Sequence, residues 1–187
     1  APRTSLYALA DSLAALMDEM QGEGVEIDAI TSLDTGDLSG HWARAQTFLG
    51  IVESYLAADR GLPDAEERQR NMVTAIAARW AQEPPQTPVI IAGSTGSRGT
   101  TAMLMQAVAQ LPQGAVVLPG FDFDMPTSVW NDLDEALLSE DHPQYRFHHL
   151  LKSLNLSRGQ VGRWTHAAPP SDARNRLVSL SLRPAPV

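Results

Sequence analysis

The sequence has no cysteine, few aromatic residues (6%) and no long hydrophobic run. Without cysteine the chain forms no disulfide, carries no thiol nucleophile and builds no thiolate metal site. No apolar stretch approaches the ~18 residues that a membrane-spanning helix needs, and no basic-then-apolar signal segment is present. We therefore expect a cytoplasmic protein with no membrane contact and, because it begins at Ala1, a piece of a longer chain.

Basic residues are fewer than acidic ones, so the formal net charge is −8. This balance argues against nucleic-acid binding by bulk charge alone. Residues 1–140 carry 20 acidic and 7 basic residues, whereas residues 141–187 carry 2 acidic and 7 basic ones. The split fits either an uneven solvated surface or a basic face on an acidic body.

The first part of the chain has helical periodicity. Apolar residues recur every three or four positions over 4–21 and again over about 38–58, and Trp42 is expected in the second buried stripe. A third helix begins at Asp64, a capping residue followed by Glu66 and Glu67, with Trp80 on its apolar side. The proline-rich spacer 83–88 then separates a helical subdomain, residues 1–83, from the rest.

Residues 88–187 have the pattern of strands and helices that is typical of an α/β domain. Two uniformly apolar segments, 89–92 and 115–118, flank a helical stretch, which predicts parallel strands covered on both faces. Further helices are expected near 127–138, 144–154 and 171–181. The predicted fold class is thus α/β, a partial parallel sheet with flanking helices behind an all-helical subdomain.

The loop that follows the first strand contains Gly93, Gly96 and Gly99. A phosphate-binding Walker A loop counted from Gly93 needs glycine and lysine where Arg98 and Gly99 stand. The dinucleotide fingerprint and the nucleophile elbow fail on spacing as well. The loop is either a plain turn or a weak anion site, whose contacts would come from Ser94, Thr95, Ser97 and Arg98.

Other candidate groups lie further along the chain. Asp122 and Asp124 follow the second strand, where paired carboxylates could hold Mg²⁺. The adjacent His148 and His149 point about 100° apart on a helix, so they do not easily share a metal. Basic residues that could contact DNA phosphates are Arg146, Lys152, Arg158 and Arg163, although aromatic residues interleave with them only thinly.

Three strings in order, PVIIAGSTGS, LPQGAVVLPGFD and HPQYRFHHLL, give the chain a family resemblance. Together with the helical segment ahead of them, they resemble the AddB subunit of bacterial AddAB helicase-nucleases, in the form carried by alphaproteobacteria. The resemblance covers nearly the whole chain. It implies a fragment of the helicase-like amino-terminal half, with residues 1–83 similar to subdomain 1B and residues 88–187 similar to motor domain 1A without its Walker A segment.

The resemblance also places degenerate motor motifs. An active motor carries Asp-Glu at the end of one strand and Gly-Asp at the end of the next, whereas here those places look like Ala92-Gly93 and Gly120-Phe121-Asp122. Alanine and glycine neither ligate Mg²⁺ nor accept a proton. The resemblance thus implies a non-catalytic fragment that acts in double-strand break repair and recombination. By the same resemblance, the fragment is expected to bind DNA and an AddA-type helicase-nuclease subunit and to carry no cofactor. ATP and Mg²⁺ would belong to the partner subunit, and any iron–sulfur cluster would lie outside this region.

Two other functions remain open from the residues. One is a small nucleotide- or sugar-phosphate-binding enzyme that uses the loop 93–99 with Asp122 and Asp124. The other is an acidic interaction module whose helices in residues 1–83 dock on another subunit.

Overall fold

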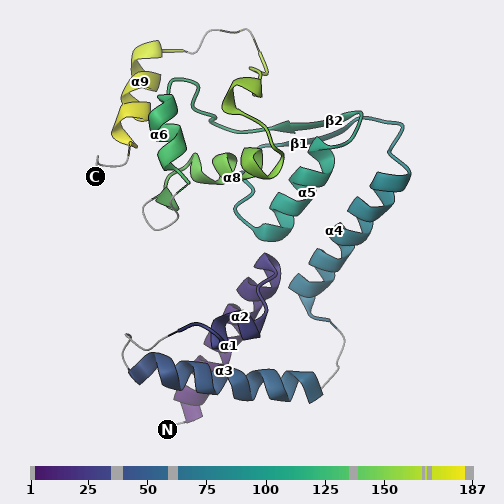
Figure 1. The fold of residues 1–187 in the computed structure, drawn as a ribbon, viewed down its shortest axis with the longest axis vertical. Coiled ribbons are helices and arrows are strands. Elements are labelled where there is room, and N and C mark those ends of the chain that lie inside the picture. The colour runs from purple at the N-terminus through teal and green to yellow at the C-terminus, as the bar shows by residue number, and fades with distance from the viewer. Residues whose placement is uncertain are drawn as a thin grey trace. The chain divides into compact units, whose positions relative to one another are not determined.

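A computed structural model describes residues 3–34, 40–58, 63–134, 139–165, 167 and 170–183. Helices dominate, and a small parallel sheet with flanking helices makes the fold α/β (Figure 1). By their internal contacts the residues form two compact units: 1–76 with 98–100, and 77–97 with 101–187. No described helix combines the length and hydropathy needed to cross a bilayer.

The first unit is helical. It contains α1 (Arg3–Glu23), α2 (Ile27–Thr31), α3 (Gly40–Ala58) and the start of α4 (Ala65–Gln82). The Gln46 side chain of α3 donates hydrogen bonds to the carbonyls of Ile30 (3.1 Å) and Leu33 (2.8 Å), which ties α3 to the end of α2. The short helix α2 was not predicted, whereas the cap of α4 is confirmed: Asp64 Oδ1 accepts a bond from the Glu67 N–H at 3.0 Å.

Far fewer apolar residues are buried in this unit than the helical periodicity predicts. Met20, Leu49 and Val73 are its buried described hydrophobic residues, while Leu6 and Leu9 are 56% and 64% exposed. The expectation that Trp42 lies in the core is wrong, because 49% of it is exposed. A stripe of apolar residues is buried only where another element covers it, and this small unit offers few such surfaces.

The second unit contains the sheet. Strands β1 (Val89–Ala92) and β2 (Gly114–Val117) pair in parallel, with Val89 opposite Gly114, and α5 (Gly99–Ala109) connects them. Figure 1 shows the two strands side by side with α5 between them in the chain. The second strand begins one residue earlier than predicted.

The prediction that both faces of the sheet are covered is wrong for β1. Burial alternates along this strand, and Ile90 is 53% exposed. One face of β1 packs inward and the other is open to solvent, as in a sheet covered on one side.

The core of the second unit lies beside the ends of the strands. It joins α6 (Thr127–Asp132) to α8 (Tyr145–Ser153) and consists of Met125, Trp130, Leu133, Phe147 and Leu151. A short 3₁₀ helix, η1 (Arg158–Gln160), and α9 (Asp172–Ser181) follow. The helix predicted near 127–138 ends at Asp132, and residues 135–138 lie outside the described residues.

Candidate functional site

The loop after β1 is shaped by its own hydrogen bonds. Gly93 and Gly96 have positive φ angles of 80° and 66°, which favour glycine. The Gly96 N–H donates to Ser94 Oγ at 3.2 Å, and the Gly93 N–H donates to the Val117 carbonyl at 3.3 Å, extending the ladder to β2. Thr95 and Ser97 are exposed. The geometry supports the interpretation of this segment as a turn.

The segment after β2 lies at the same sheet edge, because the parallel strands place Ala92 opposite Val117. Here Asp122 Oδ1 accepts bonds from the N–H groups of Asp124 (2.8 Å) and Met125 (3.1 Å). This carboxylate therefore shapes its own turn, in the way Asp side chains commonly do. Gly120, with φ of 68°, precedes it.

Two side chains from distant parts of the sequence hold this turn. Buried Gln144 accepts from the Asp122 N–H (2.9 Å) and donates to the Gly120 carbonyl (2.9 Å). Arg158 donates to the carbonyls of Asp122 (2.9 Å) and Met125, and its guanidinium lies over the Trp130 ring, 5.7 Å from the centroid. The turn is a braced structural element.

The described residues add no further ligand to the magnesium site predicted at Asp122 and Asp124. Asp124 is exposed, and the described residues contain no group of three His, Cys, Asp or Glu residues placed to hold a metal. With one oxygen of Asp122 engaged in the turn, the pair supplies less than the several oxygen ligands that a hard cation requires.

Four of the five basic residues predicted to contact an anion or DNA have a polar partner in the described part of the chain, and the fifth, Arg163, lies over the Phe123 ring, 4.2 Å from its centroid. Arg146 pairs with Glu140 (3.1 Å) and Lys152 with Asp134 (2.5 Å). Arg98, counted with the first unit, lies 3.7 Å from Glu66, and Arg158 braces the turn. A phosphate would have to compete with these partners.

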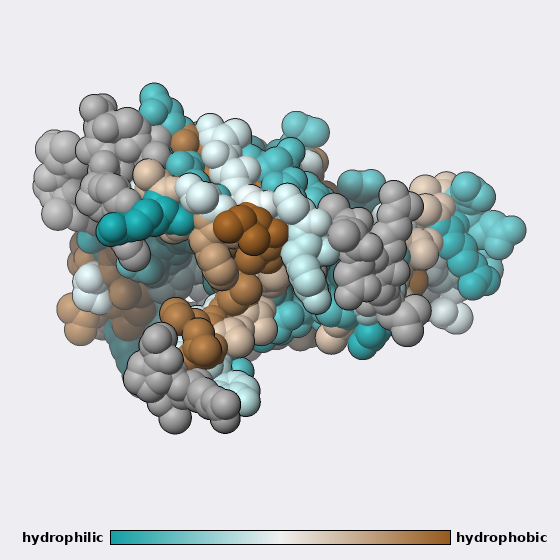
Figure 2. Space-filling view, turned by 90° about the horizontal axis from the view of Figure 1, so that it is seen from below, coloured by the Kyte–Doolittle hydropathy of each residue, from teal (hydrophilic) through white to brown (hydrophobic). Residues whose placement is uncertain are grey.

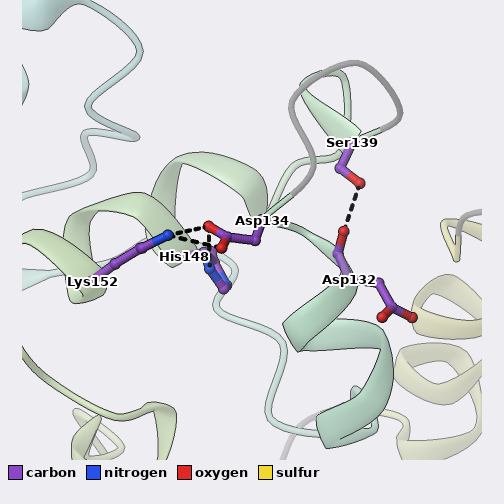
Figure 3. Close-up of polar contacts among 5 residues, drawn as sticks. All are labelled: Asp132, Asp134, Ser139, His148 and Lys152. Carbon is purple, nitrogen blue, oxygen red and sulfur yellow. Dashed lines mark hydrogen bonds and ion pairs between the residues drawn. The ribbon is translucent and has the colours of Figure 1, made fainter.

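A polar cluster joins α8 to the residues that follow α6 (Figure 3). Lys152 and His148 both reach Asp134, the histidine with Nε2 at 3.5 Å from Oδ1. The hydrogen bond from Lys152 holds the pKa of Asp134 below its ordinary value. Burial, followed by the charge of His148, lowers the pKa of His149. The two histidines therefore belong to packing and ion pairing on α8.

Sequence analysis named neither Gln144 nor His142 as a site residue. His142 is 8% exposed, and its Nδ1 accepts the Gln144 N–H at 3.0 Å. Burial lowers the pKa of His142, opposed by the charge of Asp122 and the backbone of Leu182. The sequence offered one signal for these two residues: two polar residues flank a proline just before the aromatic residues Tyr145 and Phe147. Polar residues beside a core segment often satisfy backbone groups.

Comparison with known proteins adds no relative: no family model, no curated protein and no solved structure matches this chain.

Proposed function

We propose that this chain is a non-catalytic, helicase-like α/β scaffold of an AddB-type subunit, acting in DNA double-strand break repair. The observation that carries the proposal is the sheet edge, where the acid pair of a working motor has no counterpart. Ala92 ends the first strand and Gly93 follows it, while Asp122 after the second strand is engaged in its own turn. The choice of family in this proposal rests on the resemblance of the three ordered sequence strings.

Within this proposal, contact with DNA is weak and salt-dependent. The side chains of Arg146 and Lys152 are 39% and 60% exposed, so each can reach a phosphate only by sharing or leaving its carboxylate partner. The scaffold role therefore outweighs DNA binding, and an AddA-type subunit supplies the motor and the nucleotide.

The test uses Asp122→Asn, which keeps an oxygen to accept the turn's N–H groups and removes the charge. We expect the purified chain to show no DNA-stimulated ATP hydrolysis, and the substitution to leave the turnover of its complex with the AddA-type subunit within about twofold. Phosphate release in a coupled assay measures both. ATP turnover by the chain alone that Asp122→Asn abolishes would contradict the proposal and favour the small nucleotide-binding enzyme.

A second function, docking on a partner subunit, is favoured by the exposed side chains of the first unit. On α3, Phe48, Ile51 and Tyr55 are 51%, 64% and 70% exposed, and their spacing of three and four residues puts them on one face. Figure 2 shows hydrophobic groups open on the face that it draws. Apolar patches of this kind commonly mark protein interfaces.

Ile51→Glu tests this docking face in the subunit that contains the chain. Placing a carboxylate on the apolar stripe should reduce copurification with the AddA-type subunit at least about tenfold, because a charge in an apolar interface loses its hydration. Stability should stay unchanged, since Ile51 is exposed. Ala43→Glu adds the same charge to exposed α3 surface outside the stripe and serves as the control. Equal copurification of the two variants would remove the face from the interface.

A further inference from the structure

A cavity of about 610 Å³ lies in the second unit between α6, α8 and the segment around η1. Its volume falls within the range of small-molecule sites. The lining contains Lys152 and Arg158, and no aspartate or glutamate of the described part of the chain shares it. The charged lining is thus net positive, on a chain whose formal net charge is −8. A cavity with this lining favours an anion.

The ammonium group of Lys152 can contact a ligand while it keeps its ion pair. Its Nζ lies 2.5 and 2.8 Å from the two carboxylate oxygens of Asp134, so the pair uses at most two of its three N–H groups. The Lys152 side chain is 60% exposed, and Asp134 lies outside the lining. One N–H therefore remains for an anion, although the charge of Asp134 weakens the attraction.

The guanidinium group of Arg158 also keeps free donors. It carries five N–H groups, and its bonds to the carbonyls of Asp122 and Met125 use two of them. These two bonds and the Trp130 ring hold the group in one place. Because the donor is already ordered, little conformational entropy is lost when a ligand binds to it.

The rest of the wall is largely apolar. Phe123, Leu156 and Val161 line it together with Trp130, and Leu156 is 39% exposed. An inorganic ion is too small to cover this surface, whereas the organic part of a larger ligand can bury it. The cavity therefore combines a cationic side with an apolar and aromatic side.

We propose that this cavity binds a small aromatic phosphate monoester, whose phosphate oxygens accept hydrogen bonds from Lys152 Nζ and from a free N–H of Arg158. A dianion fits better than a carboxylate because two cations and no described acid line the cavity. Two sources carry this chemistry: a free phosphorylated small molecule and the phosphorylated end of a DNA strand. Only the second source rests on the function proposed above.

Phenyl phosphate is the probe, titrated at pH 7.5, where its phosphate is mainly doubly charged, into the ¹⁵N-labelled chain. We expect a saturable shift of the Trp130 indole N–H signal with a Kd on the order of 1 mM, as for a ligand of this size. Benzyl alcohol, which lacks the charge, should bind at least about tenfold more weakly. Absence of a saturable shift up to about 20 mM phenyl phosphate, or equal binding of benzyl alcohol, would overturn the site.

Charge variants separate a built site from general attraction. Lys152→Gln should weaken phenyl phosphate about tenfold. Arg146→Gln removes the same charge from α8 outside the cavity and should change the affinity by less than about twofold. Asp134→Asn should instead strengthen binding about threefold, because Lys152 then faces no carboxylate.

The three side chains are between 39% and 60% exposed, so we expect all three variants to fold. Equal losses in Lys152→Gln and Arg146→Gln, or no gain in Asp134→Asn, would contradict the proposal.

A second titration identifies the source of the phosphate. Tetrathymidylate with a phosphate on its 5′ end is compared with the same oligonucleotide ending in a hydroxyl, by the same Trp130 signal. If a strand end is the source, the phosphorylated form should bind at least about tenfold more tightly than phenyl phosphate. If a small molecule is the source, it should bind no better. Equal binding of the two oligonucleotides, both tighter than phenyl phosphate, would indicate contact with backbone diesters and overturn the monoester site. None of these measurements involves ATP turnover, so their failure is distinguishable from failure of the scaffold function.

Discussion

Replacing Gly114 by alanine should destabilise the second unit by about 3–4 kcal/mol, the largest effect expected of any single change here. A Cβ atom at this position would lie 1.8 Å from the carbonyl oxygen of Val108 and 2.9 Å from the Leu111 Cβ. Backbone cannot yield as a flexible side chain does, so β2 or the end of α5 must move. Because Gly114 pairs with Val89, that movement also weakens the sheet.

Urea unfolding followed by far-UV circular dichroism measures this loss. Gly159→Ala is the matched control, because its Cβ would meet nothing within 4 Å and the same methyl is added to the unfolded chain. The control should change stability by less than about 0.5 kcal/mol. Equal stability of the two variants would show that the close approach of α5 to β2 is wrong.

Arg158→Ala should cost about 2–4 kcal/mol, the second largest effect. Its guanidinium bonds the carbonyls of Asp122 and Met125 and lies over Trp130, and alanine leaves both carbonyls without this partner. Arg158→Lys should recover only part of the loss, because a single ammonium group does not reproduce the planar fork. Thermal and urea unfolding of the three proteins give the comparison.

This substitution also separates bracing from DNA contact. Arg146→Ala is the control, since Arg146 was predicted alongside Arg158 as a DNA-contacting residue but forms a surface pair with Glu140 and lies over the neighbouring Tyr145 ring, bracing no turn. It should change stability by less than about 1 kcal/mol. If Arg158→Ala instead keeps full stability and lowers DNA affinity in an anisotropy titration, the residue contacts DNA and does not brace the turn.

Elements with strong local signals were predictable from the sequence. The capping pattern at Asp64 predicts the start of α4. The two apolar segments around a helical stretch predict β1, α5 and β2. Burial was not predictable to the same degree. Ile90 and Trp42 are apolar residues in well-predicted elements, yet both are about half exposed, because burial depends on whether another element covers that face.

The candidate site shows the same division. The positions of Gly120 and Asp122 after the second strand, and of Ala92 and Gly93 where the first one finishes, followed from chain order. The role of Asp122 did not follow, because its turn is completed by Gln144, 22 residues away, and by Arg158, 36 residues away. Sequence spacing alone carries no information on such long-range bonds.

By itself, the sequence determined that the chain has no thiol chemistry, no Walker A lysine and a helical part followed by a strand–helix–strand unit. These properties depend on residue types and on local periodicity, which neighbouring positions decide. The tertiary structure alone decided that the basic residues of α8 pair with acids, that the glycine loop is a turn, and that Lys152 and Arg158 line one cavity. Those outcomes depend on contacts between side chains that are far apart in the sequence, and long-range packing decides which of these contacts form.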